Sequence, residues 1–431
     1  MSKFFSNRWW IVAASVCGLL VGLGPINTFA FGVFLKPVTA ELAIGRGVLG
    51  AALFGGFLMS TLGTAILGWA LDHWGTRRVM IPGLFLCTCI LALQSMLQPN
   101  ILWIFASLGI NGLVFACQSP LPYGNVVAQW FDRERGLALG IAMAGVGLGA
   151  IVVPQFATLL IAHFGWRLGY VGLGAAVLIV GWLPVSIFLR EPPGFLPNAQ
   201  RRLEPASASA IISATPGLRA REGFRTWRFW SLTLAFFFPV VAINGSLTQI
   251  VALLTDRGIS LQLAVSALSA AGLALIVGRI LSGWCLDRYW GPYVAVVFYL
   301  IPMVGIALLA SGVNGVVPLV GAVLCGLGIG ADVDLMAFFV SRYFGMKEYA
   351  KLYGVMLSLF TLANGVGPAL SGLTFDRYRS YTPIFIVYEV LLVIACSQFL
   401  RLPAYPYPAP LRHGRTPETK AVTAEALGSA H

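Results

Sequence analysis

Long apolar segments separated by short polar ones run through most of the chain. A segment of about 18 or more apolar residues is long enough for a helix to cross the hydrocarbon layer of a membrane. The first segment is too long for the core of a signal peptide and lacks a small-residue cleavage site, so it is expected to stay in the mature chain. The pattern predicts an all-α membrane protein with twelve spans, over residues 9–34, 48–70, 79–97, 101–129, 137–162, 168–189, 229–254, 261–285, 293–311, 315–340, 352–374 and 381–400.

Composition and charge agree with this prediction and add an orientation. Only 10% of the 431 residues are charged, whereas about a quarter of the residues in a soluble domain carry charge. If both termini lie in the cytoplasm, 21 of the 28 Lys and Arg residues fall on the cytoplasmic side, six fall on the other side, and Arg279 lies inside a span. Such a bias follows the positive-inside rule, so the net charge of +12 implies no nucleic-acid partner. We expect a multi-pass protein of a cell membrane, the inner membrane in a Gram-negative source.

Matches at one spacing indicate an internal repeat. The stretch "GWALDHWGTRR" begins at Gly68, and a shorter version of it, "GWCLDRYWG", begins 215 residues later at Gly283. Further matches lie 213 to 217 residues apart: "INT" at 26–28 with "ING" at 243–245, Trp130-Phe131 with Tyr343-Phe344, Gly140 with Gly354, and Pro154 with Pro368. Several matches at one spacing, with loops in register, predict two halves of similar structure.

The segment between the halves is rich in Pro, Ala, Ser and Arg, which is typical of a linker. The predicted organisation is therefore one of two six-helix halves joined through the cytoplasm. Its parts are an N-terminal half (1–189), a cytoplasmic linker (190–228), a C-terminal half (229–400) and a cytoplasmic tail (401–431).

The loop between the second and third spans of each half resembles the loop signature of the major facilitator superfamily. The matching residues are Gly68, Asp72, Gly75, Arg77 and Arg78 in the first copy, and Gly283, Asp287 and Arg288 in the second. The resemblance covers essentially the whole chain and implies two pseudo-symmetric halves around a cavity lined by spans 1, 4, 7 and 10. Gly68 would let helices approach, and Asp72 would cap a helix N-terminus or pair with an Arg in one conformation only, as a latch. A solvated turn that aids membrane insertion is the alternative.

A second resemblance narrows the family. The stretch "WFDRERGLALGIAMAGVGLG" at 130–149, with "FGWR" at 164–167 and "FGVFLKP" at 31–37, is similar to segments of monocarboxylate transporters and their bacterial oxalate and formate relatives. Two features depart from that family. Phe29 stands where proton-coupled animal members carry a Lys, and "SNRWW" replaces the Asp-Gly pair that often opens their first helix. The proton route of those members is therefore not carried over to this chain.

Arg279 is the strongest candidate for binding a substrate. It precedes Asp287 by eight residues and so lies about 12 Å inside the cytoplasmic boundary. An unpaired Arg at that depth costs roughly 2.5 to 3.5 kcal/mol on insertion scales, so it should face a cavity or a counter-ion. In the monocarboxylate and oxalate relatives a matching Arg binds the substrate carboxylate, and the planar guanidinium suits a carboxylate. The alternative is a structural ion pair, with a partner on another helix because Leu275 stands where animal members place an Asp.

Two carboxylates in the tenth span, Asp332 and Asp334, are candidates for carrying a proton. They precede Arg342 by ten and eight residues, so their depth, about 12 to 15 Å, matches that of Arg279. Two residues on a helix are separated by about 200° of rotation, so the carboxylates cannot both face one cavity. Burial penalises a charged carboxylate and a nearby Arg favours it, so one of the two could take up a proton when substrate occupies Arg279. Spacing leaves open which one, and a structural pair with no proton role is the alternative.

Other polar residues in the cavity-lining spans could complete a substrate site. The fourth span carries Asn111, Gln118 and Asn125 at spacings of seven, hence on one face of a helix. The prolines of "QSPLPYG" predict a bend or break within that span. Besides Arg279, the candidates for substrate binding are Asn27, Gln118, Tyr123, Asn125, Asn244 and Thr248. Hydrogen bonding between helices is the alternative role for each of them.

The predicted function is secondary active transport of a small organic anion, a monocarboxylate by resemblance, together with protons and by alternating access. Anion exchange and proton-driven export of organic or drug-like compounds are the alternatives, although Arg279 would repel cations. No Ser, His and Asp set, phosphate loop or metal-ligand spacing occurs, so no enzyme, cofactor or metal site is expected. The expected partners are the anion, protons and the lipid bilayer, and the chain is expected to act as a monomer.

Overall fold

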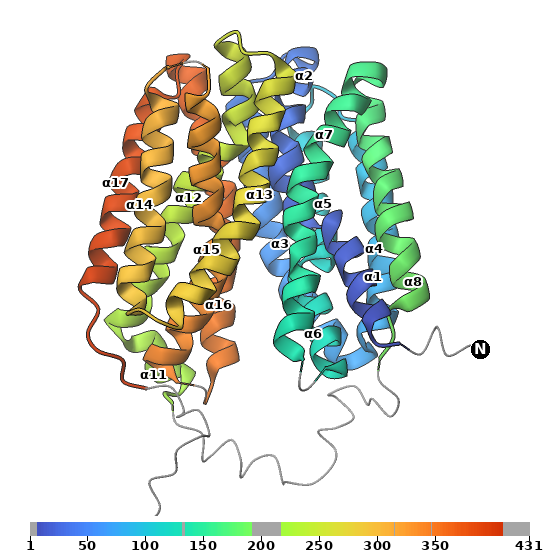
Figure 1. The fold of residues 1–431 in the computed structure, drawn as a ribbon. Coiled ribbons are helices and arrows are strands. Elements are labelled where there is room, and N and C mark those ends of the chain that lie inside the picture. Colours follow the sequence, from blue (N-terminus) through green and yellow to red (C-terminus); the bar gives the residue numbers. More distant parts are fainter. Residues whose placement is uncertain (1–6, 132–133, 192–216, 314, 346, 408–431) are drawn as a thin grey trace, which may run out of the picture.

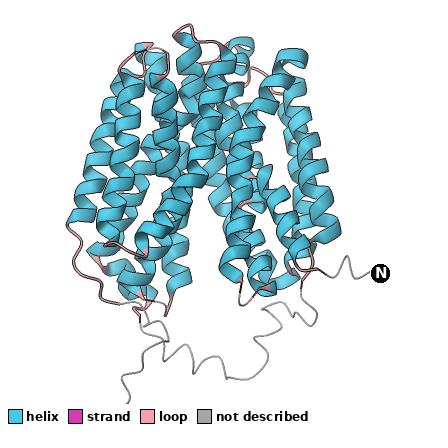
Figure 2. Ribbon diagram, viewed as in Figure 1, coloured by secondary structure: helices cyan, strands magenta, loops and turns pink. Residues whose placement is uncertain are grey.

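The computed structural model describes residues 7–131, 134–191, 217–313, 315–345 and 347–407, and the regular elements within these ranges are all helices (Figure 2). The N-terminal half contains α1 (Trp9–Leu20), η1 (Pro25–Ala30), α2 (Phe31–Leu42), α3 (Arg46–Trp74), α4 (Thr76–Gln94), α5 (Ile101–Phe115), η2 (Ala116–Gln118), α6 (Pro120–Trp130), α7 (Arg135–Ala176), η3 (Val177–Trp182) and α8 (Leu183–Phe188). The C-terminal half contains α11 (Ala220–Arg225), α12 (Trp227–Asp256), α13 (Leu261–Leu286), α14 (Gly291–Ala310), α15 (Val317–Phe344), α16 (Tyr349–Tyr378) and α17 (Thr382–Leu400). The all-helical prediction is confirmed.

Eleven helical stretches within the described ranges are long and apolar enough to cross a membrane. One of them, Leu137–Phe188, has 52 residues, which is far more than a single crossing requires. Its backbone turns at Gly165 (φ 78°, ψ 167°), where the positive φ is one that glycine adopts without steric cost. The turn falls between the spans predicted over 137–162 and 168–189, so this stretch supplies two crossings and the twelve-span fold is confirmed.

Proline interrupts two of the crossings. In the first, α1 ends at Leu20, and a π-helical turn that starts with Pro25 leads into α2, which continues to Leu42, well beyond the predicted end at 34. In the fourth, Ser119 adopts an extended conformation (ψ 163°) and α6 then starts at Pro120. Proline has no amide hydrogen to donate to the helix ladder, which is the physical reason for both interruptions.

The helices form two bundles that stand side by side (Figure 1). Helices α1 to α8 make the N-terminal half, with two clusters of buried apolar side chains, and α11 to α17 make the C-terminal half around a third cluster. The start of α1, the end of α8, the start of α12 and the end of α17 lie at the same end of the molecule, which we call the linker face. The other end, at the top of Figure 1, is called the opposite face.

Most of the linker predicted over 190–228 lies outside the described residues. The described part packs against the C-terminal half from Gly217 onwards. The Leu218 amide donates a hydrogen bond to the Phe344 carbonyl (2.9 Å), and the Ala220 amide donates one to the Glu348 carboxylate. The described end of the predicted linker is therefore packed on the C-terminal half and does not act as a free connection between the halves.

The two halves touch near the opposite face. The contacting helices are α2 with α12, α3 with α16, and α7 with α13. Small residues permit this approach, since a Cβ at Gly50 would lie 2.8 Å from the Pro368 carbonyl oxygen and one at Gly272 would lie 2.9 Å from Ala150. Among the described residues, the hydrogen bonds between the halves come from the same region, from Lys36, Arg46 and Gly47 at the opposite face and from Gln155 and Ser269 farther along.

Toward the linker face the same helices separate. Gly147 on α7 and Ile276 on α13 meet across the halves. About two helical turns from this contact, toward the linker face, lie Gly140 on α7 and Gly283 on α13. Gly140 and Gly283 therefore project from the contacting faces. A Cβ added to any of four glycines on the contacting helices would nevertheless meet no heavy atom within 4 Å, namely at Gly68, Gly140, Gly283 and Gly354. The space between the halves is open at the linker face.

Candidate substrate and proton site

Arg279 on α13 and Asp334 on α15 form an ion pair, with Arg279 Nε 3.4 Å from Asp334 Oδ2. The two helices pack closely because glycines lie between them: a Cβ at Gly330 would overlap the Leu275 carbonyl oxygen. Gly330 and Leu275 stand about one turn before Asp334 and Arg279, so the close approach brings the charged side chains level with each other. The counter-ion that the sequence required from another helix is supplied by α15.

This ion pair is loosely held. Arg279 Nε is buried and donates no hydrogen bond to any described residue, although it lies within ion-pair distance of Asp334. The two side chains are 26% and 42% exposed, and Tyr353 on α16 is within electrostatic range of both. A guanidinium with unused N–H donors can exchange one carboxylate acceptor for another. The geometry therefore leaves Arg279 able to bind an incoming carboxylate.

Asp332 lies on the other side of α15. It is fully buried, and neither of its carboxylate oxygens has a hydrogen-bond partner among the described residues. Its neighbour is Tyr299 on α14, whose buried hydroxyl lies within interaction range of the Asp332 carboxylate. The two carboxylates thus face different helices, as the predicted 200° of rotation requires, and Asp334 is the one that meets Arg279.

Four polar residues of the N-terminal half point into that half. Asn111 Nδ2 donates to Asn27 Oδ1 (2.8 Å), and both side chains are buried among apolar residues of α4 and α7. The Tyr123 hydroxyl donates to Gln118 Oε1 (2.8 Å), and this pair is buried too. In this conformation Asn27 and Asn111 bind each other between two crossings, which is the interhelical role that the sequence left open, and Gln118 and Tyr123 bind each other within one crossing.

The remaining substrate-binding candidates lie apart from one another. Asn125 is exposed on α6 and accepts a hydrogen bond from Gln129 (3.2 Å). Asn244 and Thr248 are buried on α12, where each donates to a carbonyl of its own helix. Thr248 borders the contact with α2, since a Cβ at Gly32 would lie 2.6 Å from its carbonyl oxygen. None of the three is hydrogen-bonded to Arg279 within the described part of the chain.

The first loop motif is tied to the end of the N-terminal half. Gly75 ends α3 with a positive φ of 82°, and the next amide, that of Thr76, donates to the Glu191 carboxylate. Arg77 donates to the Ser186 carbonyl (2.9 Å), and Arg78 is exposed. The Asp72 side chain lies outside the described residues. Glu191 was not predicted as part of this motif, because it lies 115 residues after Thr76 and no local sequence pattern indicates their contact.

The second loop motif is exposed at the linker face. Asp287 follows the last residue of α13, and its carboxylate has no hydrogen-bond or ion-pair partner among the described residues. Arg288 stacks on Trp284, with the guanidinium carbon 4.1 Å from the ring centre. Gly283 lies one turn earlier and faces open space. The latch pairing predicted for these residues would require the halves to meet at this face, and it stays a prediction.

At the opposite face an ion network joins the two halves. Arg46 donates to both oxygens of Asp256 (2.6 and 3.1 Å), and Lys36 Nζ lies 2.6 Å from Asp256 Oδ1. Arg46 also donates to the Tyr381 hydroxyl (2.7 Å), which in turn donates to Gln249 (3.1 Å). Burial raises the pKa of Tyr381 to about 12, so this hydroxyl is neutral at physiological pH. Sequence analysis predicted no site here, because Lys36 and Arg46 entered it only through the charge balance between the two sides of the membrane.

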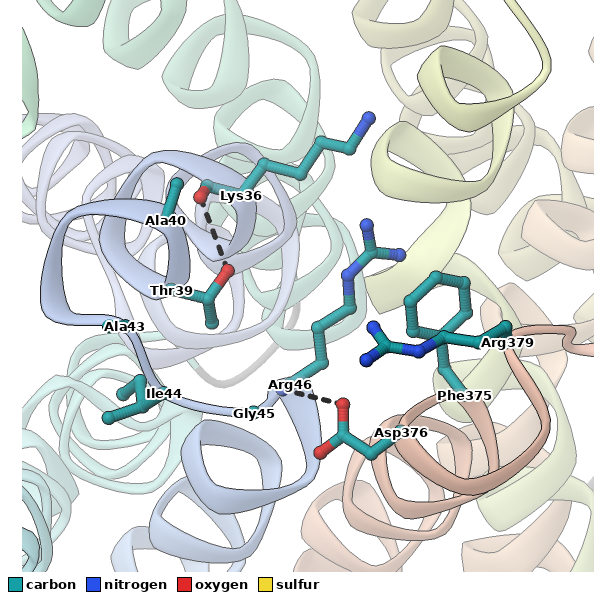
Figure 3. Close-up of a pocket in the computed structure, with 10 residues that line it drawn as sticks. All are labelled: Lys36, Thr39, Ala40, Ala43, Ile44, Gly45, Arg46, Phe375, Asp376 and Arg379. Carbon is teal, nitrogen blue, oxygen red and sulfur yellow. Dashed lines mark hydrogen bonds between the residues drawn. The ribbon is translucent and has the colours of Figure 1, made fainter.

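Asp376, at the end of α16, completes this contact by capping α3. Its two oxygens accept the amides of Arg46 (3.0 Å) and Gly47 (2.7 Å), as the close-up in Figure 3 shows for the first. These amides belong to the first turn of α3 and have no partner within the helix. A Cβ at Gly45 would collide with the Asp376 carboxylate, so a larger residue there would displace Asp376 from the amides that it caps. The contact closes the opposite face by joining the start of α3 to the end of α16.

The described residues contain no group of three or more His, Cys, Asp or Glu side chains that could hold a metal ion. The seven cysteines are free thiols. The charged side chains at the Arg279 site are therefore considered as ligands for an organic anion and for protons.

The comparisons with known proteins define the class to which the chain belongs. The family model of the Major Facilitator Superfamily matches residues 17–332. The chain belongs to the Major Facilitator Superfamily, and it is a membrane transporter rather than an enzyme.

Relatives of known name refine this class. The chain is 26% identical to human Monocarboxylate transporter 11 over 421 residues, which cover 91% of this chain and 83% of that protein. It is 28% identical to mouse Monocarboxylate transporter 12 over 307 residues, which cover 66% and 63% of the two chains. It is 26% identical to the MFS-type transporter pytF of Aspergillus terreus over 284 residues, covering 65% and 90%. The chain thus spans less than two thirds of the length of mouse Monocarboxylate transporter 12, and more than two thirds of the length of the other two relatives.

Solved structures share the fold at low identity. A D-xylose-proton symporter has a TM-score of 0.73 with 15% identity, covering 94% of this chain and 99% of its own. A bacterial homolog of the human lysosomal transporter Spinster, in an inward-facing and unoccupied conformation, has a TM-score of 0.67 with 17% identity, covering 93% and 97%. These likenesses show the fold alone.

Proposed function

We propose that this transporter carries a small monocarboxylate together with a proton, and that Arg279 binds the carboxylate. The observation that carries the proposal is the loose ion pair between Arg279 and Asp334, in which Arg279 Nε makes no hydrogen bond. The names of the relatives, which include monocarboxylate transporters, agree with an anionic substrate. A carboxylate that meets the guanidinium with two parallel hydrogen bonds would form a stronger interaction than the single 3.4 Å contact that Asp334 provides.

Asp334 is the group that we propose takes up the proton. When the substrate carboxylate occupies Arg279, Asp334 loses its counter-ion and a second negative charge stands beside it. Protonation of Asp334 removes that charge, so that substrate, Arg279 and Asp334 together cross with the same net charge as the empty site. Proton and anion uptake are thereby coupled at one place.

Asp332 has a different role in this proposal. Its oxygens have no ion-pair partner within 4 Å in the described structure, and its neighbour Tyr299 lies inside the C-terminal half. A charged carboxylate buried without a counter-ion is costly. We assign Asp332 a structural role next to Tyr299, outside the transport cycle.

Alternating access follows from the arrangement of the halves. We propose that the linker face lies in the cytoplasm and that this conformation faces inward, because the excess of Lys and Arg at that face follows the positive-inside rule. In the outward-facing state the linker face would be closed, with α3 against α16 and α7 against α13. The contacts would form at the four glycines whose added Cβ meets no atom in the present conformation, Gly68, Gly140, Gly283 and Gly354. Asp72 and Asp287 would then find their partners across the halves, and the opposite-face contact of Arg46 would open.

Counterflow in proteoliposomes tests the substrate class. The purified protein is loaded with one unlabelled acid and offered labelled lactate, pyruvate, acetate and oxalate in turn. The proposal requires exchange of at least one monocarboxylate. Counterflow of organic cations without any carboxylate would instead favour the export of drug-like compounds.

A further inference from the structure

A cavity lies at the opposite face, remote from Arg279. Its volume is about 610 Å³, and it is lined by the end of α2, the turn into α3 and the end of α16 (Figure 3). It therefore lies between the two halves, directly beside the contact that closes this face. Three cationic side chains line it, from Lys36, Arg46 and Arg379.

Two carboxylates are already engaged here: Asp376, which lines the cavity, and Asp256, which pairs with Lys36 and Arg46. Both oxygens of Asp376 accept backbone amides at the start of α3. Both oxygens of Asp256 are held by Arg46 and Lys36, at distances between 2.6 and 3.1 Å. Three cations against two carboxylates leave one positive charge in excess.

Arg379 carries that excess charge. Its guanidinium has no hydrogen-bond, ion-pair or ring partner among the described residues, and the residue is exposed. Figure 3 shows its guanidinium directed into the cavity, between Arg46 and Asp376. Its backbone has a positive φ of 53°, so this residue also ends α16 and holds a fixed place at the cavity wall.

We propose that this cavity is an anion vestibule, in which Arg379 binds a small carboxylate from the medium at the opposite face. A planar guanidinium with free N–H donors favours a carboxylate over a spherical anion, because it offers two parallel hydrogen bonds. A carboxylate bound there also lies beside Lys36 and Arg46 and competes with Asp256 for them. This proposal rests on the proposed function in one respect, that the carboxylate bound here is the transported substrate.

Charged thiol reagents measure the potential of the vestibule directly. Ala40 is exposed and lines the cavity, so Ala40→Cys, in a background without the seven native cysteines, introduces a small reporter. The reporter is labelled from the opposite face with a sulfonate methanethiosulfonate and with its trimethylammonium counterpart. We expect the anionic reagent to be favoured, and Arg379→Asn to lower the anion-to-cation rate ratio about fourfold in about 0.01 M salt, as one charge at about 8 Å would. Asn is chosen because it tolerates the positive φ.

The matched control is Arg377→Asn, which removes the same charge two residues earlier. Arg377 is exposed but does not line the cavity. An equal fall in the ratio for both variants, or no fall for Arg379→Asn, would overturn the proposal. A second arm compares sodium acetate with sodium chloride at equal ionic strength. Protection of the reporter by acetate alone supports a carboxylate site, and equal protection by both salts means general screening and contradicts it.

These measurements stay informative if the proposed function fails. They are repeated in the Arg279→Gln variant, where the interior site is lost, and the vestibule must still prefer the anionic reagent. Where transport can be followed, Arg379→Asn should raise the KM for uptake about threefold at low ionic strength without changing kcat, and the difference should vanish in about 0.5 M salt. A change in kcat with unchanged KM would place Arg379 in the transport cycle rather than in a vestibule.

Discussion

Arg279 on α13 and Asp334 on α15 lie 3.4 Å apart, yet the buried Nε of Arg279 makes no hydrogen bond. Such a pair gives the buried Arg279 charge the counter-ion that it needs inside a membrane, but it leaves N–H donors of the guanidinium free for another ligand. An ion pair that served only stability would be expected to use those donors. The incomplete pairing is what connects this site to a substrate with a carboxylate.

Replacing Arg279 by Lys should abolish most of the uptake although the charge is kept. Lysine offers a single ammonium in place of the planar fork, so the loss should be about 10- to 100-fold in kcat/KM. The control is Arg342→Lys, at the linker-face end of α15, where the guanidinium carbon lies 5.1 Å from the Phe338 ring centre and outside the site. The measurement is the initial rate of uptake into proteoliposomes. Near wild-type uptake by Arg279→Lys would show that this residue does not bind the substrate.

Enlarging the unobstructed glycines should trap the inward-facing state. The Cβ of a Leu at Gly140 or Gly283 meets no heavy atom within 4 Å in this conformation, but the side chain would overpack the contact formed when the linker face closes, at a cost of about 1 to 3 kcal/mol. Transport should fall while a cysteine at the opposite face becomes less accessible to an impermeant label. Leu273→Phe, which enlarges an exposed side chain of α13, is the control and should change neither. Increased accessibility at the opposite face would contradict the proposed cycle.

Removing the counter-ion of Arg46 should favour the outward-facing state. Asp256→Asn releases both Arg46 and Lys36, and a conformational coupling of about 1 to 3 kcal/mol corresponds to a population shift of about 5- to 150-fold. Glu41→Gln breaks another ion pair at the same face, with Arg167 (2.9 Å), which stays within the N-terminal half. Spin-label distances across the opposite face should lengthen only in Asp256→Asn. Equal lengthening in both variants would mean that the effect is one of surface charge.

The same contact should be insensitive to pH across the physiological range. Burial raises the pKa of Tyr381 from an ordinary value of about 10 to about 12, and the neutral hydroxyl is the form that donates to Gln249. Its contribution to closure is therefore complete below about pH 10 and is lost as pH rises through 12. Spin-label distances between pH 6 and 11 should change only at the alkaline end, and Tyr381→Phe should remove that change. A transition near pH 7 in the wild type would require a different titrating group.

The length of the apolar segments and the repeat were sufficient to predict the twelve crossings and the two halves. The turn at Gly165 falls where the gap between two predicted spans left room for it. The end of α2 at Leu42 was missed, because Lys36 and Glu41 lower the hydropathy of a segment that is nevertheless helical.

The substrate-site candidates were harder to predict, because side-chain direction depends on unbroken helical phase. A spacing of seven puts Asn111 and Asn125 on one face only if the helix is continuous. The extended conformation of Ser119 breaks that phase, so Asn111 binds Asn27 inside the half while Asn125 is exposed. The contact of Asp376 with Arg46 joins residues 330 positions apart, and no local pattern indicates it.

Proton-driven accumulation in a matched pair of variants tests the central claim most directly. Asp334→Asn and Asp332→Asn make the same chemical change two residues apart on one helix, but only Asp334 contacts Arg279. With a labelled monocarboxylate that the wild type accumulates under an inward proton gradient, Asp334→Asn should retain exchange of labelled for unlabelled substrate and lose accumulation, while Asp332→Asn should retain both. Accumulation by Asp334→Asn at the wild-type level, or its loss only in Asp332→Asn, would contradict the coupling of proton and carboxylate at the Arg279 and Asp334 pair.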